Sequence, residues 1–303
     1  MDKVMSLKEA VSANVHDGDS VAIGGFLARA PMGIVYEVIR QKKKELTVIA
    51  DSNGEGVDFL IGAGLVKKVE GAWIWISTAT AYNFRRALEK GIPNKIEMED
   101  YSNLAIGMRY LAGSLGIPFM PIRSLLASDI PKYNPNVKII DDPYTNERIC
   151  LVPAANPDVA FIHIQRADKN GNGQIWGILG NDVNLARAAK RVILTCEEIV
   201  PTKELRKIPN MTAIPGYCVD AVVELPFGAY QQGVPGFFWI DTPQRRSWSA
   251  GSQTYEGFLS FLDEWVYGCN NHEELLRKVG SERLAKLRKM ELDNSPIPQI
   301  IPG

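Results

Sequence analysis

Histidine and cysteine are scarce in this sequence of 303 residues, which has three histidines and four cysteines. The cysteines are far apart and form no Cys-x-x-Cys spacing; they are Cys150, Cys196, Cys218 and Cys269. Zinc sites and the disulfide frameworks of small secreted proteins depend on closely spaced or paired cysteines. We therefore expect no metal site, and we interpret most of the cysteines as small, buried apolar side chains.

The sequence also lacks the run of about 18 apolar residues that a membrane-spanning helix needs. Its first residues, MDKVMSLKEAV, turn polar too early for the apolar core of a signal peptide. The 34 Lys and Arg residues nearly balance the 35 Asp and Glu residues, and they form no clustered basic block. We expect a cytoplasmic protein that binds neither membrane nor nucleic acid.

With 46% hydrophobic and 23% charged residues, the chain has the composition of a globular protein. Helix-like and strand-like segments alternate, and the strands predicted at Ser20–Ile23 and Leu46–Ala50 each run into a glycine-rich turn. This order is typical of an α/β fold with an open, mostly parallel sheet. We predict one domain over residues 1–303, with a helical C-terminal annex at about 254–290.

Local signals predict several helices. Ser6 and Glu9 have the spacing of a capping box, which begins a helix through about Asn14. In the helix predicted at Asn103–Leu115, four apolar residues at helical spacing form one stripe: Leu104, Met108, Leu111 and Leu115. The other helices predicted are one that begins near Pro31, Tyr82–Lys90, about Tyr255–Tyr267, His272–Val279 and Glu282–Met290.

Near-continuous apolar runs predict further strands. They are Val69–Ile76, Arg148–Val152, Val159–Gln165, Val192–Cys196 and Val219–Leu225. The last four have the pattern of strands that are covered on both faces. We interpret the Pro- and Asn-rich stretch Ser128–Asp142 as irregular.

A glycine pair stands between the first predicted strand and the next helix, at Gly24-Gly25-Phe26. Two glycines let a ligand approach the backbone, and the amides around them can donate to an anion or an oxyanion. The alternative is a tight turn in which glycine is needed only for steric reasons. A dinucleotide site with Asp51 as the ribose-binding acid is a weaker alternative, because the G-x-G-x-x-G spacing is missing.

A second polar loop, Asp51–Gly56, follows the next strand, on the side where open sheets bind ligands. Ser52 and Asn53 are candidates for lining a pocket. Glu55 is either a nucleophile or base or, as we prefer, a solvated loop glutamate. Ser77 and Thr78 follow another predicted strand, where their hydroxyls either bind a carboxylate or cap the helix near Tyr82.

No self-sufficient catalytic set accompanies these loops. His163 lies in a strand without a Ser or Cys nucleophile elbow, so we interpret it as a hydrogen-bonded structural histidine. The adjacent Glu197 and Glu198 either anchor backbone amides, as we prefer, or face a site.

An ordered set of segments resembles the α subunit of family I CoA-transferases, and most closely the α subunit of the glutaconate CoA-transferase type. The segments are Ser20–Phe26 (SVAIGGF), Leu60–Val66, Pro118–Ile122 (PFMPI), Ile162–Asn172 (IHIQRADKNGN), Thr195–Val200 (TCEEIV) and Ile214–Ala229 (IPGYCVDAVVELPFGA). The resemblance extends from about Met1 to about Leu287, so it covers nearly the whole chain. It implies the open α/β fold of these enzymes.

The resemblance also implies a β partner of the same fold, in a heterodimer or an α2β2 heterotetramer. The substrates of this heteromer would be an acyl-CoA and a carboxylic acid, and it would need no tightly bound cofactor. The nucleophilic glutamate would belong to the β subunit. From the loops and the resemblance together, we predict these substrate-binding and oxyanion residues in this chain: Gly24, Gly25, Phe26, Ser52, Asn53, Gly54, Ser77 and Thr78.

One departure bears on specificity. Where many α subunits read GAHP, this chain reads Gly228-Ala229-Tyr230-Gln231, so a histidine contact is missing. A ring-opening CoA-ester hydrolase, a decarboxylase of the same architecture and a non-catalytic ligand-binding module stay open as alternatives.

Overall fold

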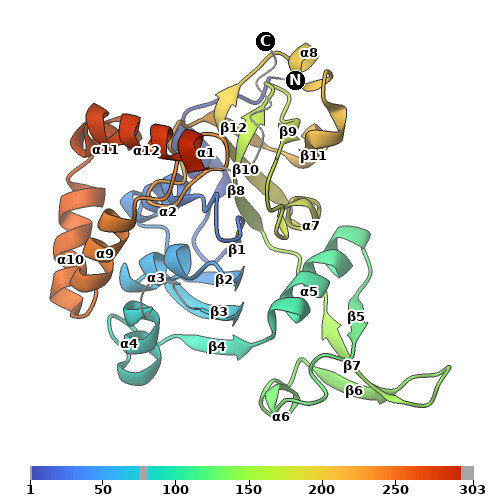
Figure 1. The fold of residues 1–303 in the computed structure, drawn as a ribbon. Helices are drawn as coiled ribbons and strands as arrows, with labels where there is room; N and C mark the ends of the chain where they lie inside the picture. The colour runs from blue at the N-terminus through green and yellow to red at the C-terminus, as the bar shows by residue number, and fades with distance from the viewer. Residues whose placement is uncertain (1, 75–80, 295–303) are drawn as a thin grey trace.

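The computed structural model describes residues 2–74 and 81–294. A nine-stranded sheet forms its centre, and seven of these strands are parallel in the order β4-β3-β2-β1-β8-β10-β12 (Figure 1). The short strands β9 and β11 extend the sheet in antiparallel fashion beyond the end of β8. A separate antiparallel sheet has the order β5-β7-β6. The predicted α/β class with a mostly parallel sheet is confirmed.

The strands have the following bounds: β1 Ser20–Ile23, β2 Leu46–Asp51, β3 Val66–Ala72, β4 Glu97–Asp100, β5 Phe119–Ile122, β6 Lys138–Asp141, β7 Arg148–Pro153, β8 Val159–Ala167, β9 Gly173–Gln174, β10 Arg191–Ile199, β11 Thr212–Ile214 and β12 Ala221–Glu224. The α-helices are α1 Leu7–Asn14, α2 Met32–Arg40, α3 Gly54–Gly62, α4 Tyr82–Lys90, α5 Asn103–Leu115, α6 Ile130–Tyr133, α7 Asp182–Ala188, α8 Thr202–Leu205, α9 Thr242–Gly251, α10 Tyr255–Leu262, α11 His272–Val279 and α12 Ser281–Asn294. A π-helical turn at Asp263–Tyr267 continues α10.

Two hydrophobic cores lie against the sheet. One joins it to α1, α2, α3 and the C-terminal helices, and it contains Phe59 stacked on Trp248 at 4.9 Å between ring centroids. The other core joins the sheet to α5 and α7. Figure 1 shows these two groups of helices on either side of the strands. Within residues 2–74 and 81–294, no helix is long and apolar enough to cross a bilayer.

Several predictions from local signals are confirmed. The capping box at Ser6 and Glu9 is formed, and α1 ends at Asn14. Helices α4, α5 and α11 have the predicted bounds. Strand β8 is buried along nearly its whole length, as expected of an interior parallel strand. How the chain divides into domains stays a prediction.

Other predictions about strands and loops were wrong. Strand β3 covers Val66–Ala72 rather than Val69–Ile76, and the end of the predicted range lies outside the described residues. Strand β7 alternates between half-buried and buried residues after an exposed Arg148, because it belongs to the small antiparallel sheet. The stretch interpreted as irregular contains α6 and β6, and α9 was not predicted from the sequence.

The apolar stripe predicted on α5 is exposed to solvent at both of its ends. Leu104 and Leu115 are 51% and 62% exposed, while Ile106 and Tyr110 on the opposite side of the helix are buried. The periodicity identified residues that share one face, but α5 packs on the sheet and on α7 mainly through its other face, and Met108 is the stripe residue that also packs against this core.

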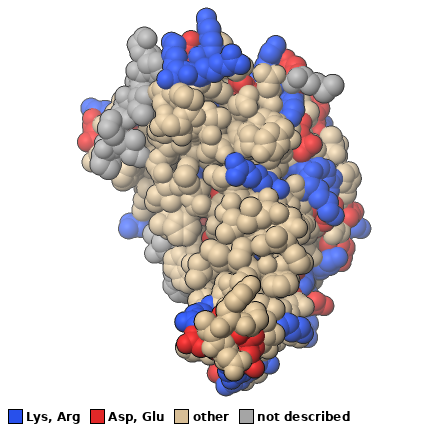
Figure 2. All heavy atoms as spheres, turned by 90° about the vertical axis from the view of Figure 1, so that its right-hand side faces the viewer, with Lys and Arg blue, Asp and Glu red and all other residues tan. Residues whose placement is uncertain are grey.

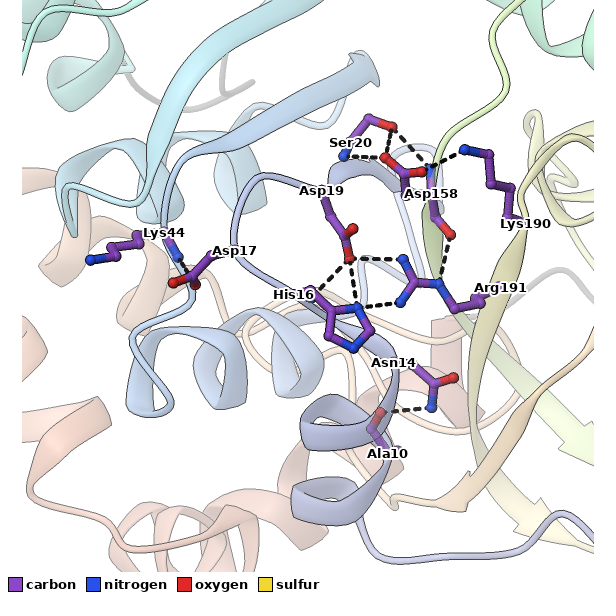
Figure 3. A network of polar contacts seen from close by, with 10 residues as sticks. All are labelled: Ala10, Asn14, His16, Asp17, Asp19, Ser20, Lys44, Asp158, Lys190 and Arg191. Carbon is purple, nitrogen blue, oxygen red and sulfur yellow. Dashed lines mark hydrogen bonds and ion pairs between the residues drawn. The ribbon is translucent and has the colours of Figure 1, made fainter.

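Polar contacts fix the amino ends of three parallel strands (Figure 3). The backbone and hydroxyl of Ser20 donate to Asp158, at 2.9 and 2.7 Å. Arg191 donates to the Asp19 carboxylate at 2.9 Å and to the Nδ1 atom of His16 at 2.5 Å. These contacts hold β1, β8 and β10 in register at the edge of the sheet where those strands begin.

A buried carboxyl joins α3 to α4. Asp58 accepts hydrogen bonds from the Phe84 backbone N–H at 2.8 Å and from the Asn83 side chain at 2.9 Å. It therefore satisfies an amide in the first turn of α4, which the helix cannot pair internally. Burial raises the pKa of Asp58 to about 7, although these two hydrogen bonds act in the opposite direction.

Replacing Asp58 with asparagine is expected to change how stability depends on pH. An aspartate in an unfolded chain has a pKa of about 4, so this group's contribution to stability is present below about pH 4 and is lost as the pH rises through 7. Between about pH 5 and 7, the free energy of unfolding of the wild type should fall relative to that of Asp58→Asn by up to about 1.4 kcal/mol per pH unit.

Urea unfolding of both proteins across this pH range measures the difference. Asp129→Asn, at an exposed carboxylate, is the control and should run parallel to the wild type. A constant difference between Asp58→Asn and the wild type at all pH values would contradict the prediction.

Candidate active site

The candidate site lies at the carboxyl edge of the parallel sheet. From β1 the chain builds the sheet outward through β2, β3 and β4, and it then crosses to β8 on the other side of β1. Such a switch point leaves a crevice outside the strand ends, where open α/β sheets bind ligands. A pocket of about 240 Å³ lies there. It is lined by Gly25, Leu27, Ser52, Asn53, Gly54, Glu55, Trp73, Gln232, Ile240 and Arg245.

Gly25, the second glycine of the pair after β1, lines this pocket, but the backbone amides of both glycines already have acceptors. The Gly24 N–H donates to the Phe161 carbonyl at 2.8 Å, and the Gly25 N–H donates to the Asp182 carboxylate at 2.8 Å. Gly25 has a φ of +82°, and a Cβ there would lie 2.7 Å from the Arg29 carbonyl oxygen. The backbone conformation of the loop therefore requires glycine at this position.

A buried ion pair holds the glycine pair in place. Arg29 and Asp182 are 0% and 1% exposed, and their charged atoms are 2.6 Å apart. Arg29 also donates to the carbonyls of His163 and Ile178, at 3.2 and 2.6 Å. Because Asp182 binds both Arg29 and the Gly25 amide, this ion pair joins the loop after β1 to α7 and to the middle of β8.

The loop after β2 supplies the opposite wall. The Asn53 side chain donates to the Gly24 carbonyl, which ties the two loops together. The Ser52 hydroxyl accepts from the Asn103 side chain at 2.8 Å, so α5 contacts the site through its first residue. Gly54 begins α3, and the first-turn amides of that helix have no intrahelical acceptors.

Glu55 lines the pocket from the first turn of α3 and is only 3% exposed. One carboxylate oxygen accepts from Gln232 at 2.8 Å, and the other pairs with Arg245 from α9. The preferred interpretation of Glu55 as a solvated loop residue was therefore wrong. Because α3 begins at Gly54, Glu55 lies in its first turn and points into the protein, where it pairs with Arg245.

Asp51 lies behind the pocket rather than in it. Burial raises its pKa to about 6; the nearby Asp182 charge adds to this, and the 2.6 Å hydrogen bond from Asn181 opposes it. The side chain is thus used in an internal contact between β2 and the start of α7. Nothing in this arrangement corresponds to the ribose-binding acid of a dinucleotide site.

His163 and Glu197 form a structural network under the site. The Nδ1 and Nε2 atoms of His163 lie 2.9 and 2.8 Å from the Thr195 hydroxyl and the Glu197 carboxylate. Glu197 also accepts from the Phe227 backbone amide at 2.8 Å. Both groups are buried, so the structural histidine and the anchoring role of Glu197 are confirmed.

The structure brings together Gly25, Ser52, Asn53 and Gly54 as lining residues, with Gly24 directly behind them. Phe26 is half-buried beside Gly180 and does not line the pocket. Ser77 and Thr78 lie outside the described residues. Residues that have only long-range partners were not identified from the sequence: Arg29, Asp182, Gln232 and Arg245.

Comparison with known proteins gives the family. Residues 4–225 match the family model described as "Coenzyme A transferase". A longer protein from Archaeoglobus fulgidus is 44% identical over 96% of this chain, which spans 65% of that relative.

Two relatives of similar length are named as CoA-transferase subunits. The A subunit of glutaconate CoA-transferase from Acidaminococcus fermentans is 38% identical over 95% of each chain. The A subunit of 3-oxoadipate CoA-transferase from Pseudomonas knackmussii is 36% identical, over 92% of this chain and 99% of the relative. The crystal structure of the Acidaminococcus enzyme superposes with a TM-score of 0.88 and covers 94% of this chain and 95% of that one. The chain therefore belongs to the coenzyme A transferase family, among relatives that are A subunits.

Proposed function

We propose that this chain is the α subunit of a heteromeric enzyme that moves CoA between an acyl-CoA thioester and a carboxylic acid. One observation carries the proposal: the pocket at the sheet's switch point holds a single carboxylate among its described lining residues, and that carboxylate is bound by Arg245 and Gln232. A nucleophilic glutamate must then come from a β subunit, in a heterodimer or an α2β2 heterotetramer.

The chemistry requires only that partner glutamate and the two substrates. Its carboxylate attacks the thioester carbonyl, which releases the CoA thiolate and leaves an acyl-glutamyl anhydride. The thiolate attacks the glutamyl carbonyl, releasing the first acid and forming a glutamyl-CoA thioester. The acceptor carboxylate then attacks this glutamyl thioester, and CoA passes to the acceptor through the reverse steps. We propose that the enzyme holds no tightly bound cofactor and that the CoA thioester is one of its substrates.

This chain's residues would shape and polarise the site. The Gly24 and Gly25 amides are engaged internally, so we assign oxyanion donation to the first-turn amides of α3 at Gly54 and Glu55. Ser52 and Asn53 would position the acyl group, and the binding role of Ser77 and Thr78 stays a prediction from the sequence. The hydrolase and decarboxylase alternatives are not favoured, since the two relatives of similar length named above are CoA-transferases.

The test compares the isolated chain with the chain co-purified with its β subunit. The β subunit is recognised by its own match to the same family model. We expect CoA exchange between an acyl-CoA and acetate, glutaconate or 3-oxoadipate only in the heteromer. CoA transfer by the purified chain alone would contradict the assignment, and release of free CoA to water without transfer would favour a hydrolase.

A matched pair of glycine substitutions tests the role of the loop after β1. Gly25 and Gly18 have φ values of +82° and +85°, but a Cβ at Gly18 meets no atom within 4 Å. Both alanine variants have a strained backbone, at a cost of about 1–2 kcal/mol. Only Gly25→Ala also collides with backbone oxygens, and a shift of the loop by about 1 Å can cost about 10²-fold in rate.

We expect kcat per folded heteromer to fall at least about tenfold in Gly25→Ala and to stay at the wild-type value in Gly18→Ala. Thermal unfolding of both variants separates stability from turnover. If Gly25→Ala lowers Tm while kcat per folded heteromer is unchanged, the loop has only a structural role.

A further inference from the structure

The apolar stripe on α5, formed by Leu104, Met108, Leu111 and Leu115, is exposed at its two ends. Leu104 and Leu115 are 51% and 62% exposed; Met108 and Leu111 between them are half-buried, and Met108 packs against the core beneath the helix. The stripe continues past the helix into Phe119, which is 45% exposed. On a helix in contact with water, this face would normally carry charged side chains.

Helix α5 has the composition of a helix that is buried all round. Its one charged residue, Arg109, is 4% exposed, because it turns inward to pair with Glu70 at 2.7 Å. The inner face packs on the sheet through Ile106 and Tyr110. Since a helix that is apolar on every side belongs in a protein interior, a second surface is needed to complete its environment.

The stripe adjoins the candidate site. Asn103, at the first turn of α5, donates to the Ser52 hydroxyl in the pocket wall at 2.8 Å. The pocket itself is lined by Leu27 and Trp73, which are 56% and 52% exposed. A protein that covers the α5 stripe is therefore positioned to reach over the pocket as well.

Figure 2 shows the side of the molecule on which α5, α7 and β5 lie in Figure 1. Uncharged residues cover much of its middle, a group of basic side chains lies across the upper middle, and most other acidic and basic side chains lie toward the margins. Depletion of charge in the centre with polar residues around it is typical of a stable subunit interface. It is not the surface that a nucleic acid or an anionic membrane would select.

Resting on the proposed function, we propose that the α5 stripe is the surface on which the β subunit docks, beside the pocket that it completes. A second copy of this chain fits the apolar surface equally well, but it brings another Glu55 that is bound by Arg245. Only a partner with a free carboxylate both covers the stripe and supplies the missing nucleophile. The stripe thus couples assembly to completion of the active site.

The experiment uses the double variant Leu104→Glu/Leu115→Glu in the full chain, co-expressed with the β subunit. The control is Leu259→Glu/Leu292→Glu, which changes two leucines on α10 and α12 that are 37% and 56% exposed. Sedimentation velocity of each isolated chain and of its mixture with the β subunit measures assembly, and Tm measures folding. We expect heteromer affinity to fall at least about a hundredfold in the stripe variant, as charges placed in an interface core do. Tm of the isolated chain should be unchanged, and the control should assemble as the wild type does.

Normal assembly of the stripe variant would overturn the proposal. So would a wild-type chain that forms a homodimer which the stripe variant dissociates, since the occupant would then be a second copy. CoA transfer by the wild-type heteromer is measured in parallel. If assembly depends on the stripe but the heteromer transfers no CoA, the docking surface is supported and the proposed function is refuted. If the heteromer transfers CoA but its assembly does not depend on the stripe, the proposed function is supported and the docking surface is refuted.

Discussion

The arrangement of the site depends on one buried ion pair, Arg29 with Asp182. Neither side chain is exposed, and removing one partner of such a pair costs about 3–5 kcal/mol because the other charge stays buried without compensation. The pair lies where the loop after β1, the middle of β8 and the start of α7 meet. Asp182, the first residue of α7, also accepts a hydrogen bond from the Gly25 amide. The ion pair therefore holds both the start of α7 and the pocket wall at Gly25.

The second constraint is the switch in strand order beside β1. The parallel direction of β1, β2 and β3 brings their carboxyl ends to one edge, and the switch leaves a crevice there, so that residues after all three strands line one small pocket. Within it, Glu55 is the group most suited to covalent chemistry, yet Arg245 and Gln232 occupy both of its oxygens. The pocket is thus shaped for a ligand while its own carboxylate has a structural role, which is the state expected of one half of a shared active site.

The sequence predicted the features that depend on neighbouring residues. The capping box of α1 and the bounds of α4 and α11 depend on residues close in the chain, and all are found. The loops after β1 and β2 were also expected at the site, since strand order alone places them at one edge, and Gly25, Ser52, Asn53 and Gly54 do line the pocket. The burial of Glu55 could not be predicted, because its partner Arg245 is 190 residues away. For α5, periodicity identified the apolar stripe but not whether it faces this chain's core or another protein.

The central claim is that this chain builds the pocket and a partner supplies the nucleophile. Intact-mass measurement of both polypeptides, after the heteromer is incubated with an acyl-CoA and quenched rapidly, tests it most directly. We expect a CoA adduct on the β subunit but none on this chain, and the adduct should persist when Glu55 is replaced by glutamine in the heteromer. A CoA adduct on this chain at Glu55, abolished by the same substitution, would contradict the account.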